Sequence, residues 1–307
     1  MDKSIHFIIL FIIMFIIFIL HDRYERSIQI EENNRFGFSS LENFEDGDFS
    51  NKKNGKMKIK IGVASMMRKP KDVEDWLNYH RNIGISKFYI RLEDTDELID
   101  YLKKQPDVIL TEGISEGKDE YKKSNYRQCT NVNNAIERAL KDNDIDWIIH
   151  IDSDELLKGD LNEFAELSDK VRTVRMNNKE AVYEKIPQGD DKCFQAKRFR
   201  DCSQIDSGCV AYVNGKGGGR VAKDVKCHGP HRFISDIPDA EERELSIYIE
   251  HYESCNFEMY KSKFKQLAKE AKTSIPFPYY LEAMDAAKNE NSDEKLKDVF
   301  KKYRVES

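Results

Sequence analysis

Residues 147–155 read WIIHIDSDE, an almost uninterrupted apolar run that ends in three carboxylates. The first five residues are apolar except for one histidine, and this composition is typical of a parallel strand that is buried on both faces. Asp152, Asp154 and Glu155 follow at once. The segment therefore indicates an α/β fold in which a central strand ends in an acidic loop.

The sequence before this segment alternates between strand and helix patterns. Strands are predicted from apolar alternation and clustering at residues 58–64, 87–92 and 108–110. Helices are predicted from apolar residues at helical spacing at residues 73–83, 96–104 and 126–141. This order predicts a Rossmann-like, mostly parallel sheet with helices on both faces. Ligands bind beyond the carboxyl ends of the strands in such sheets, where the acidic loop falls.

The second half of the chain has a less regular pattern. Strands are predicted at residues 171–176, 194–200 and 209–213, and helices at 257–271 and within 280–302. The glycine-rich residues 215–220 are predicted to form a flexible turn. We find no second linker, so residues 57–307 are predicted to be one domain.

The amino-terminal segment is predicted to anchor the chain in a membrane. Residues 5–20 are apolar apart from His6, and a helix of these 16 residues would be about 24 Å long, slightly short of a hydrocarbon core of about 30 Å. No small residues follow to form a cleavage site, so residues 1–26 are predicted to be an uncleaved single-pass anchor, with a cleaved signal peptide as the alternative. Basic residues flank the run almost equally, which leaves orientation and compartment open. Residues 27–56 are polar and aperiodic and are predicted to be a flexible stalk.

Charge and cysteine content exclude some classes of protein. The chain carries 50 basic and 56 acidic residues, for a net charge of −6, which disfavours general nucleic-acid binding. Its six cysteines contain no C-x-x-C pair, which disfavours a structural zinc site. The sequence leaves two possibilities for the cysteines: free thiols, or one or two disulfides in the second half.

The spacing of Asp152 and Asp154 suits a divalent metal. Side chains two residues apart in a loop that leaves a strand can converge on one cation, and Mg²⁺ and Mn²⁺ prefer oxygen ligands. A site with few protein carboxylates leaves coordination positions for phosphates, and the metal would stabilise a departing diphosphate. The alternative is a solvated acidic loop at the start of a helix.

Three stretches resemble glycosyltransferases of the GT-A fold, in the family-2-like and family-92-like group. They are residues 74–85 (EDWLNYHRNIGI), residues 127–134 with their Arg-Gln and Asn-Asn pairs, and residues 147–156 (WIIHIDSDEL). The resemblance is best over residues 58–160. Residues 228–233 (HGPHRF) and 251–254 (HYES) resemble the histidine motifs near the end of that family's domain. Residues 92–96 (LEDTD) depart from its D-N-x-S segment, and Leu156 replaces an aromatic residue.

The resemblance implies a nucleotide-sugar donor, Mn²⁺ or Mg²⁺, and an acceptor hydroxyl on a glycan, protein or lipid. The implied metal ligands are Asp152, Asp154 and His228, with His231 and His251 as alternatives to His228. The residues implied to bind the nucleotide sugar are Ala64, Glu74, Asp94, Gln128, Asp152, Ser153 and Arg232. Glu155 is the predicted catalytic base, with Asp206 and Asp224 as alternatives.

Two other functions remain open at the level of sequence. A metal-dependent phosphoesterase would usually need more histidine and carboxylate ligands on the early strands than this chain has. A membrane-tethered carbohydrate-binding or scaffold protein without turnover would not need both aspartates.

Overall fold

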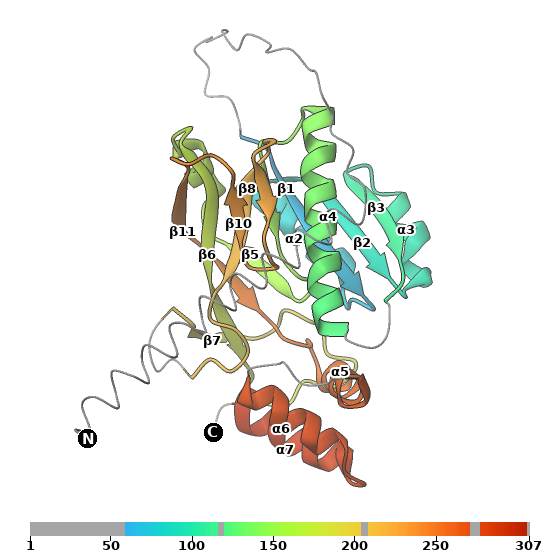
Figure 1. The fold of residues 1–307 in the computed structure, drawn as a ribbon. Coiled ribbons are helices and arrows are strands. Elements are labelled where there is room, and N and C mark those ends of the chain that lie inside the picture. The colour runs from blue at the N-terminus through green and yellow to red at the C-terminus, as the bar shows by residue number, and fades with distance from the viewer. Residues whose placement is uncertain (1–58, 116–119, 204–207, 271–276, 306–307) are drawn as a thin grey trace, which may run out of the picture. The chain divides into compact units, whose positions relative to one another are not determined.

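The computed structural model describes residues 59–115, 120–203, 208–270 and 277–305 (Figure 1). The predicted membrane anchor and stalk lie outside these residues. Within the described part of the chain, no helix has the length and apolar character needed to cross a membrane.

The first half of the chain forms the parallel part of the sheet. Its strands are β1 (Ile61–Arg68), β2 (Ile85–Glu93), β3 (Val108–Gly113) and β4 (Trp147–His150), in the order β3-β2-β1-β4. All three neighbouring pairs are parallel. The helical elements between them are α2 (Val73–Ile83), η1 (Asp96–Leu98), α3 (Ile99–Lys103) and α4 (Glu120–Asp142). The predicted strands and helices of this half are confirmed, with shifted ends.

The second half extends the same sheet in mixed orientation. Its elements are β5 (Glu155–Lys158), η2 (Leu161–Glu166), β6 (Val171–Val182), β7 (Arg198–Asp201), β8 (Lys216–Arg220), β9 (Val225–Cys227), β10 (Phe233–Ser235), β11 (Glu241–His251), α5 (Phe257–Glu270), α6 (Pro278–Ala287) and α7 (Ser292–Arg304). The order continues as β4-β8-β6-β11-β5, and β7 pairs with β6. Only the β6–β11 pair is parallel among these described strands, so the complete sheet is mixed.

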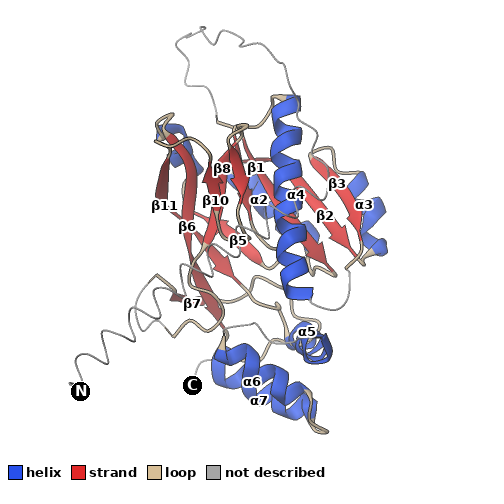
Figure 2. Cartoon of the chain, in the orientation of Figure 1, coloured by secondary structure: helices blue, strands red, loops and turns tan. Residues whose placement is uncertain are grey.

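Helices cover both faces of the parallel half, as predicted (Figure 2). Trp76 of α2 packs in one core cluster with Val63 and Ile149. Val132 of α4 packs in a second cluster with Ala64 and Ile148. Successive residues of β1 and β4 therefore point to opposite faces, as the pleat requires, and both sets are buried.

The glycine-rich residues 215–220 are not a flexible turn, so this prediction is wrong. Lys216–Arg220 form β8, a central strand between β4 and β6. A Cβ on Gly219 would lie 2.5 Å from side-chain atoms of Phe233 and Val225. The glycines therefore allow the β9–β10 hairpin to pack directly on the sheet, and tertiary packing overrides the weak strand propensity of glycine.

The prediction of a strand at residues 209–213 is also wrong, because this segment has no regular structure. A disulfide joins Cys202 to Cys209, and a second joins Cys193 to Cys255. The disulfide alternative therefore holds for these four cysteines. Cys129 and Cys227 are not joined to either pair.

Three side chains of α2 hold the outer edge of β5. Trp76 Nε1 donates to the carbonyl of Glu155 at 2.8 Å, and Tyr79 donates its hydroxyl to the carbonyl of Leu157 at 2.7 Å. The Leu157 amide donates to Nε2 of His80 at 3.3 Å. The backbone groups of this edge strand are thus paired with side chains, as buried backbone groups require. The W-x-x-Y-H pattern in residues 76–80 therefore fixes the strand that follows the acidic loop.

Candidate active site

The acidic loop lies at the carboxyl end of β4, where the sequence placed it. The Asp152 amide donates to Oε2 of Glu155 at 2.7 Å, and the Glu155 amide donates to the Asp152 carbonyl at 3.2 Å. These reciprocal bonds form a compact turn between β4 and β5. The turn holds the Asp152 side chain, which is 30% exposed, at the mouth of the sheet.

A buried lysine lies beside this turn. The ammonium group of Lys216, on β8, donates to Oδ2 of Asp152 and lies 3.3 Å from Oε2 of Glu155. Burial lowers the pKa of Lys216, but the two carboxylates outweigh burial and raise the pKa above its ordinary value. Burial raises the pKa of Asp152, but Lys216 outweighs it and lowers that pKa. At neutral pH the pair is therefore an ammonium and a carboxylate.

Glu155 is enclosed within the protein. Its side chain is 0% exposed, and one oxygen accepts a hydrogen bond from the hydroxyl of Tyr212. Burial raises the pKa of Glu155 against the opposing effect of Lys216. With Asp152, Lys216 and Tyr212 around it, Glu155 supports the acidic turn from below. Its predicted role as catalytic base remains a prediction.

Three histidines surround the acidic loop. Nε2 of His150 lies 3.8 Å from Oδ1 of Asp152. The Tyr212 ring lies between His231 and His251, with centroid distances of 4.7 and 5.0 Å. Burial, reinforced by Lys216, lowers the pKa of His150 to about 4 and that of His231 to about 3. Both rings are therefore neutral at pH 7.

Asp154 faces the segment that follows β11. Its Oδ2 accepts a hydrogen bond from the Ser254 amide at 3.2 Å, and its carbonyl accepts one from the Tyr252 amide at 2.8 Å. The same Oδ2 lies 3.8 Å from Nε2 of His251. The H-Y-E-S motif of residues 251–254 thus belongs to the site, although it lies about 100 residues further along the chain.

The pair Asp154–His251 fits a divalent cation. Metal bonds of about 2.1 Å to both atoms are compatible with their separation, because the two ligand atoms of one ion lie no more than about 4.2 Å apart. Nε2 is the ring nitrogen of His251 that faces Asp154, whereas its Nδ1 is buried and has no hydrogen-bond partner within the described structure. Asp152 pairs with Lys216. Among the described residues, the predicted set of Asp152, Asp154 and His228 does not form a group whose ligand atoms lie within 4.8 Å of one another.

His228 and Arg232 lie in the loop between β9 and β10. The His228 amide donates to the Arg232 carbonyl at 2.9 Å, and the Arg232 side chain is exposed. It is His251, one of the alternatives, that lies beside Asp154. The sequence could not separate His228 from His251, because both lie at the end of a strand and only the topology brings β11 next to β5.

The other predicted binding residues lie at different distances from the loop. Gln128 Nε2 donates to Oδ1 of Asp152 at 3.0 Å, so α4 contacts the acidic loop, and the role of Gln128 in donor binding remains a prediction. Ala64 lies beneath it, since its carbonyl is 3.0 Å from Nδ1 of His150. Ser153 is the half-buried centre of the loop. Glu74 is exposed on the first turn of α2.

Asp94 lies at the carboxyl end of β2, beside a group of charges. Its carboxylate accepts hydrogen bonds from Ser115, which together with nearby arginines lower the pKa of Asp94 although burial raises it. The neighbouring Glu93 is buried and pairs with Arg91 and Arg127, each at 2.7 Å. Asp94 thus has a fixed position at the edge where a nucleotide would bind in a sheet of this kind.

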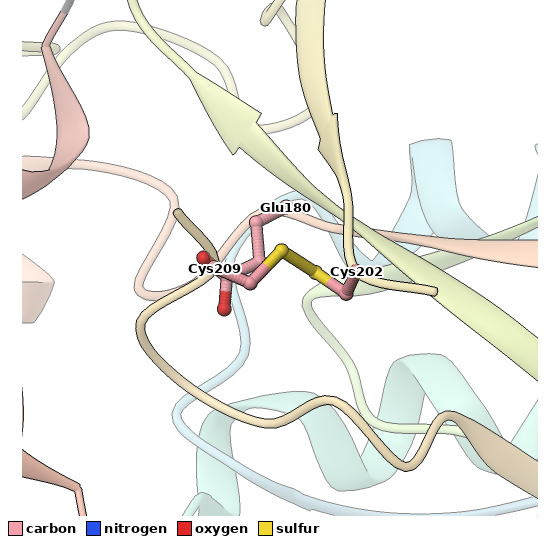
Figure 3. Close-up of side chains that lie close together, drawn as sticks. All are labelled: Glu180, Cys202 and Cys209. Atoms are coloured by element: carbon pink, nitrogen blue, oxygen red, sulfur yellow. A yellow bond between two sulfur atoms is a disulfide. The ribbon is translucent and has the colours of Figure 1, made fainter. Parts of the chain in front are cut away.

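A second cluster of metal-ligand types is not a metal site. Glu180, Cys202 and Cys209 are the three-membered group whose ligand atoms lie within 4.8 Å of one another among the described residues (Figure 3). The two sulfur atoms form a disulfide, and the carboxylate accepts hydrogen bonds from the amides of Val210 and Ala211 at 2.9 and 2.7 Å. Thiolates are needed to bind a metal, so the cluster is structural.

Comparisons with known proteins give only remote likeness. No family model matches the chain, and no curated protein matches it. Among solved structures, HddC from Yersinia pseudotuberculosis is 13% identical with a TM-score of 0.26, and covers 63% of this chain and 78% of its own. HddC complexed with GMP-PN is 11% identical with a TM-score of 0.32, and covers 64% of this chain and 94% of its own.

A third structure is the CTP:phosphocholine cytidylyltransferase LicC from Streptococcus pneumoniae. It is 16% identical with a TM-score of 0.26, and the alignment covers 46% of this chain and 64% of that one. At TM-scores this low, none of these likenesses indicates the function of this protein.

Proposed function

We propose that this protein is a metal-dependent glycosyltransferase that moves a sugar from a nucleotide-sugar donor to a hydroxyl group of a glycan, protein or lipid. The observation that supports this proposal most directly is the position of Asp154. It lies at the carboxyl end of a central parallel strand, with its carboxylate 3.8 Å from Nε2 of the neighbouring His251. A D-x-D loop and a late histidine at this position suit a hard cation that binds phosphate oxygens.

Asp154 and His251 would hold Mn²⁺ or Mg²⁺. The bound ion would supply Lewis-acid stabilisation of the charge on the departing diphosphate. The Ser254 amide donates to Oδ2 of Asp154 and the Tyr252 amide donates to its backbone carbonyl, which orients the carboxylate before any ligand binds.

Asp152 would bind hydroxyl groups of the donor. Lys216 keeps it ionised, and Gln128 fixes its orientation through Oδ1. An ionised carboxylate accepts strong hydrogen bonds from sugar hydroxyls. Asp94, at the carboxyl end of β2, and the exposed Arg232 remain candidates for contacts with the nucleotide and its phosphates.

The contact of Lys216 with Asp152 favours one alternative. An internal ammonium group next to the acidic loop supplies positive charge without a metal, as a nucleotide-sugar-binding protein without turnover could use. This alternative predicts binding that does not depend on Mn²⁺, whereas the enzyme requires the metal for turnover.

The test uses the complete chain with UDP-, GDP- and CMP-sugars, with and without MnCl₂. We expect one donor to raise the melting temperature in the presence of Mn²⁺ and to be hydrolysed slowly or transferred. We predict that Asp154→Asn and His251→Ala each lower turnover at least about 100-fold, because each removes a metal ligand.

His228→Ala is the matched control, since it removes a histidine that the structure places in the neighbouring hairpin loop. It should retain turnover within about 3-fold, because removal of a group that does not bind the ion costs little. Full turnover in Asp154→Asn, or donor binding without any effect of Mn²⁺, would contradict the metal assignment.

A further inference from the structure

The remaining two cysteines lie against each other beside the candidate site. Sγ of Cys227, on β9, is 2.8 Å from Sγ of Cys129, on α4, although 98 residues separate them in the chain. Less than about 1 Å of movement separates them from the bonded distance of about 2.05 Å. The two thiols are therefore already positioned for a covalent bond.

The backbone around the two cysteines is held in register. The Cys227 amide donates to Oδ1 of Asn133 at 2.9 Å, one turn further along α4. Phe233, paired with Cys227 in the hairpin, is 2% exposed and packs in the same core cluster as Val132 of α4. This packing keeps the hairpin on α4 while either thiol reacts.

We propose that Cys129 and Cys227 form a third, reversible disulfide that fastens the β9–β10 hairpin to α4. Cys129 is only half-buried, whereas Cys227 is 4% exposed. The Cys129 thiolate therefore attacks a small organic disulfide, such as oxidised glutathione. One thiolate leaves, and a mixed disulfide forms on Cys129.

The Cys227 thiolate then attacks the sulfur of Cys129 and releases the second small thiolate. Two protein thiols are oxidised, and one small disulfide is reduced to two thiols. A pairing with metal is disfavoured, because Cys129 and Cys227 belong to no group of three or more ligand atoms within 4.8 Å among the described residues.

The bond would join α4, which contacts Asp152, to the hairpin, whose loop contacts the residue before Lys216. Gln128, next to Cys129, donates to Asp152, while His231 in the hairpin loop is held by the carbonyl of Gly215, next to Lys216. Linking α4 to the hairpin restrains both neighbours of the acidic loop at once. The proposal does not depend on the function of the site, since it concerns only the bond and its effect on the hairpin.

The experiment is peptide mapping of the complete chain under non-reducing conditions. The protein is equilibrated in buffers of graded ratio of reduced to oxidised glutathione, and free thiols are blocked with iodoacetamide before digestion. We expect a linked pair of peptides containing Cys129 and Cys227 under oxidising buffers, and its loss under reducing buffers. Full alkylation of both cysteines, in samples where Cys193 and Cys255 are linked, would overturn the proposal.

A second measurement tests the effect on the hairpin. Cys129→Ser and Cys227→Ser cannot form the bond, and each should melt about 5 °C or more below the oxidised wild-type chain. Amide exchange over residues 225–235 should be faster in these variants than in the oxidised wild type. The paired variant Cys202→Ser/Cys209→Ser is the control, because it removes a different disulfide and should leave exchange in the hairpin unchanged. Equal exchange in oxidised wild type and Cys129→Ser would contradict the fastening role, even if the linked peptides are found.

Discussion

At the scale of single residues, Lys216 is the internal counter-ion of the acidic loop. Its side chain is 1% exposed and contacts two carboxylates. A buried charge is tolerated when partners compensate it, and the loss of one partner leaves the others buried without compensation. The sequence predicted Asp152, Asp154 and Gln128 as site residues. It did not predict Lys216, because this lysine lies in a glycine-rich stretch that has the composition of a loop.

We predict that Lys216→Met destabilises the protein by roughly 3–5 kcal/mol at pH 7, because the buried Glu155 and the partly exposed Asp152 beside it would remain without their cation. Urea unfolding followed by tryptophan fluorescence measures the effect. The double variant Lys216→Met/Glu155→Gln should recover part of the loss, since it removes one of the two uncompensated charges. A single variant as stable as wild type would contradict the role of Lys216 as an internal counter-ion.

Histidines that stay neutral make the fold sensitive to acid. Burial lowers the pKa of His80 to about 4, as it does for His150, whereas an unfolded histidine titrates near pH 6.5. Below that pH the unfolded chain binds protons that the folded chain does not. The stabilisation from neutral histidines is therefore complete above pH 6.5 and is lost as the pH falls toward 4.

We predict a fall of about 2 kcal/mol per buried histidine in the free energy of unfolding between pH 7 and pH 5. Urea titrations at these two pH values measure it. His80→Gln keeps a donor and an acceptor for Trp76 and Leu157 but cannot be protonated, so its loss on acidification should be smaller than that of wild type. An identical loss in the variant would show that His80 does not titrate in this range.

At the scale of elements, strands with a clear apolar pattern were predicted, and strands without one were missed, although β5 and β8 among the missed strands are buried. β1 and β4 are mostly apolar and buried on both faces, and β2 has Phe88, Ile90 and Leu92 on one face, so their sequence patterns predict strands. β11 begins with four exposed residues, EERE, and β5 is only four residues long, so neither has a clear apolar pattern. β8 contains three glycines, which local propensity assigns to a turn. Only the contacts with β4, β6 and the hairpin explain why it is a strand.

We predict that Gly219→Ala destabilises the protein by about 1–3 kcal/mol, because its Cβ would lie 2.5 Å from Phe233 and Val225. Thermal unfolding measures the effect. Gly229→Ala provides a contrast at a glycine where a Cβ meets nothing within 4 Å and the cost comes only from the positive φ of 138°. If Gly219→Ala is fully stable, the hairpin does not pack on β8 as described.

At the scale of the whole described domain, the carboxyl-terminal helices support the acidic loop through buried ion pairs. Arg304 of α7 donates to Glu253 at 2.6 Å and lies 3.4 Å from Glu180. Glu253 also accepts hydrogen bonds from Lys263 of α5 and Tyr280 of α6, at 2.9 and 2.7 Å. Because Glu253 follows His251 in the segment that holds Asp154, three helices converge on the back of the site.

We predict that Arg304→Met lowers the free energy of unfolding by roughly 3–5 kcal/mol, since it removes the buried cation that Glu253 and Glu180 share in the interior. Chemical denaturation measures this change. Lys302→Met is the control on the same helix, because its pair with Glu282 is largely exposed and should contribute less than about 1 kcal/mol. Similar effects of the two variants would contradict a special role for the buried ion pairs.

The hydrogen bonds from α2 to β5 affect whether molecules of this protein can associate through the edge of their sheets. An uncovered border of a β-sheet offers free amide and carbonyl groups to which a foreign chain can add. On β5 these backbone groups already form hydrogen bonds with the side chains of Trp76, Tyr79 and His80. This flank of the sheet is therefore closed to strand addition, so the segment that follows the acidic loop is protected from joining a growing aggregate.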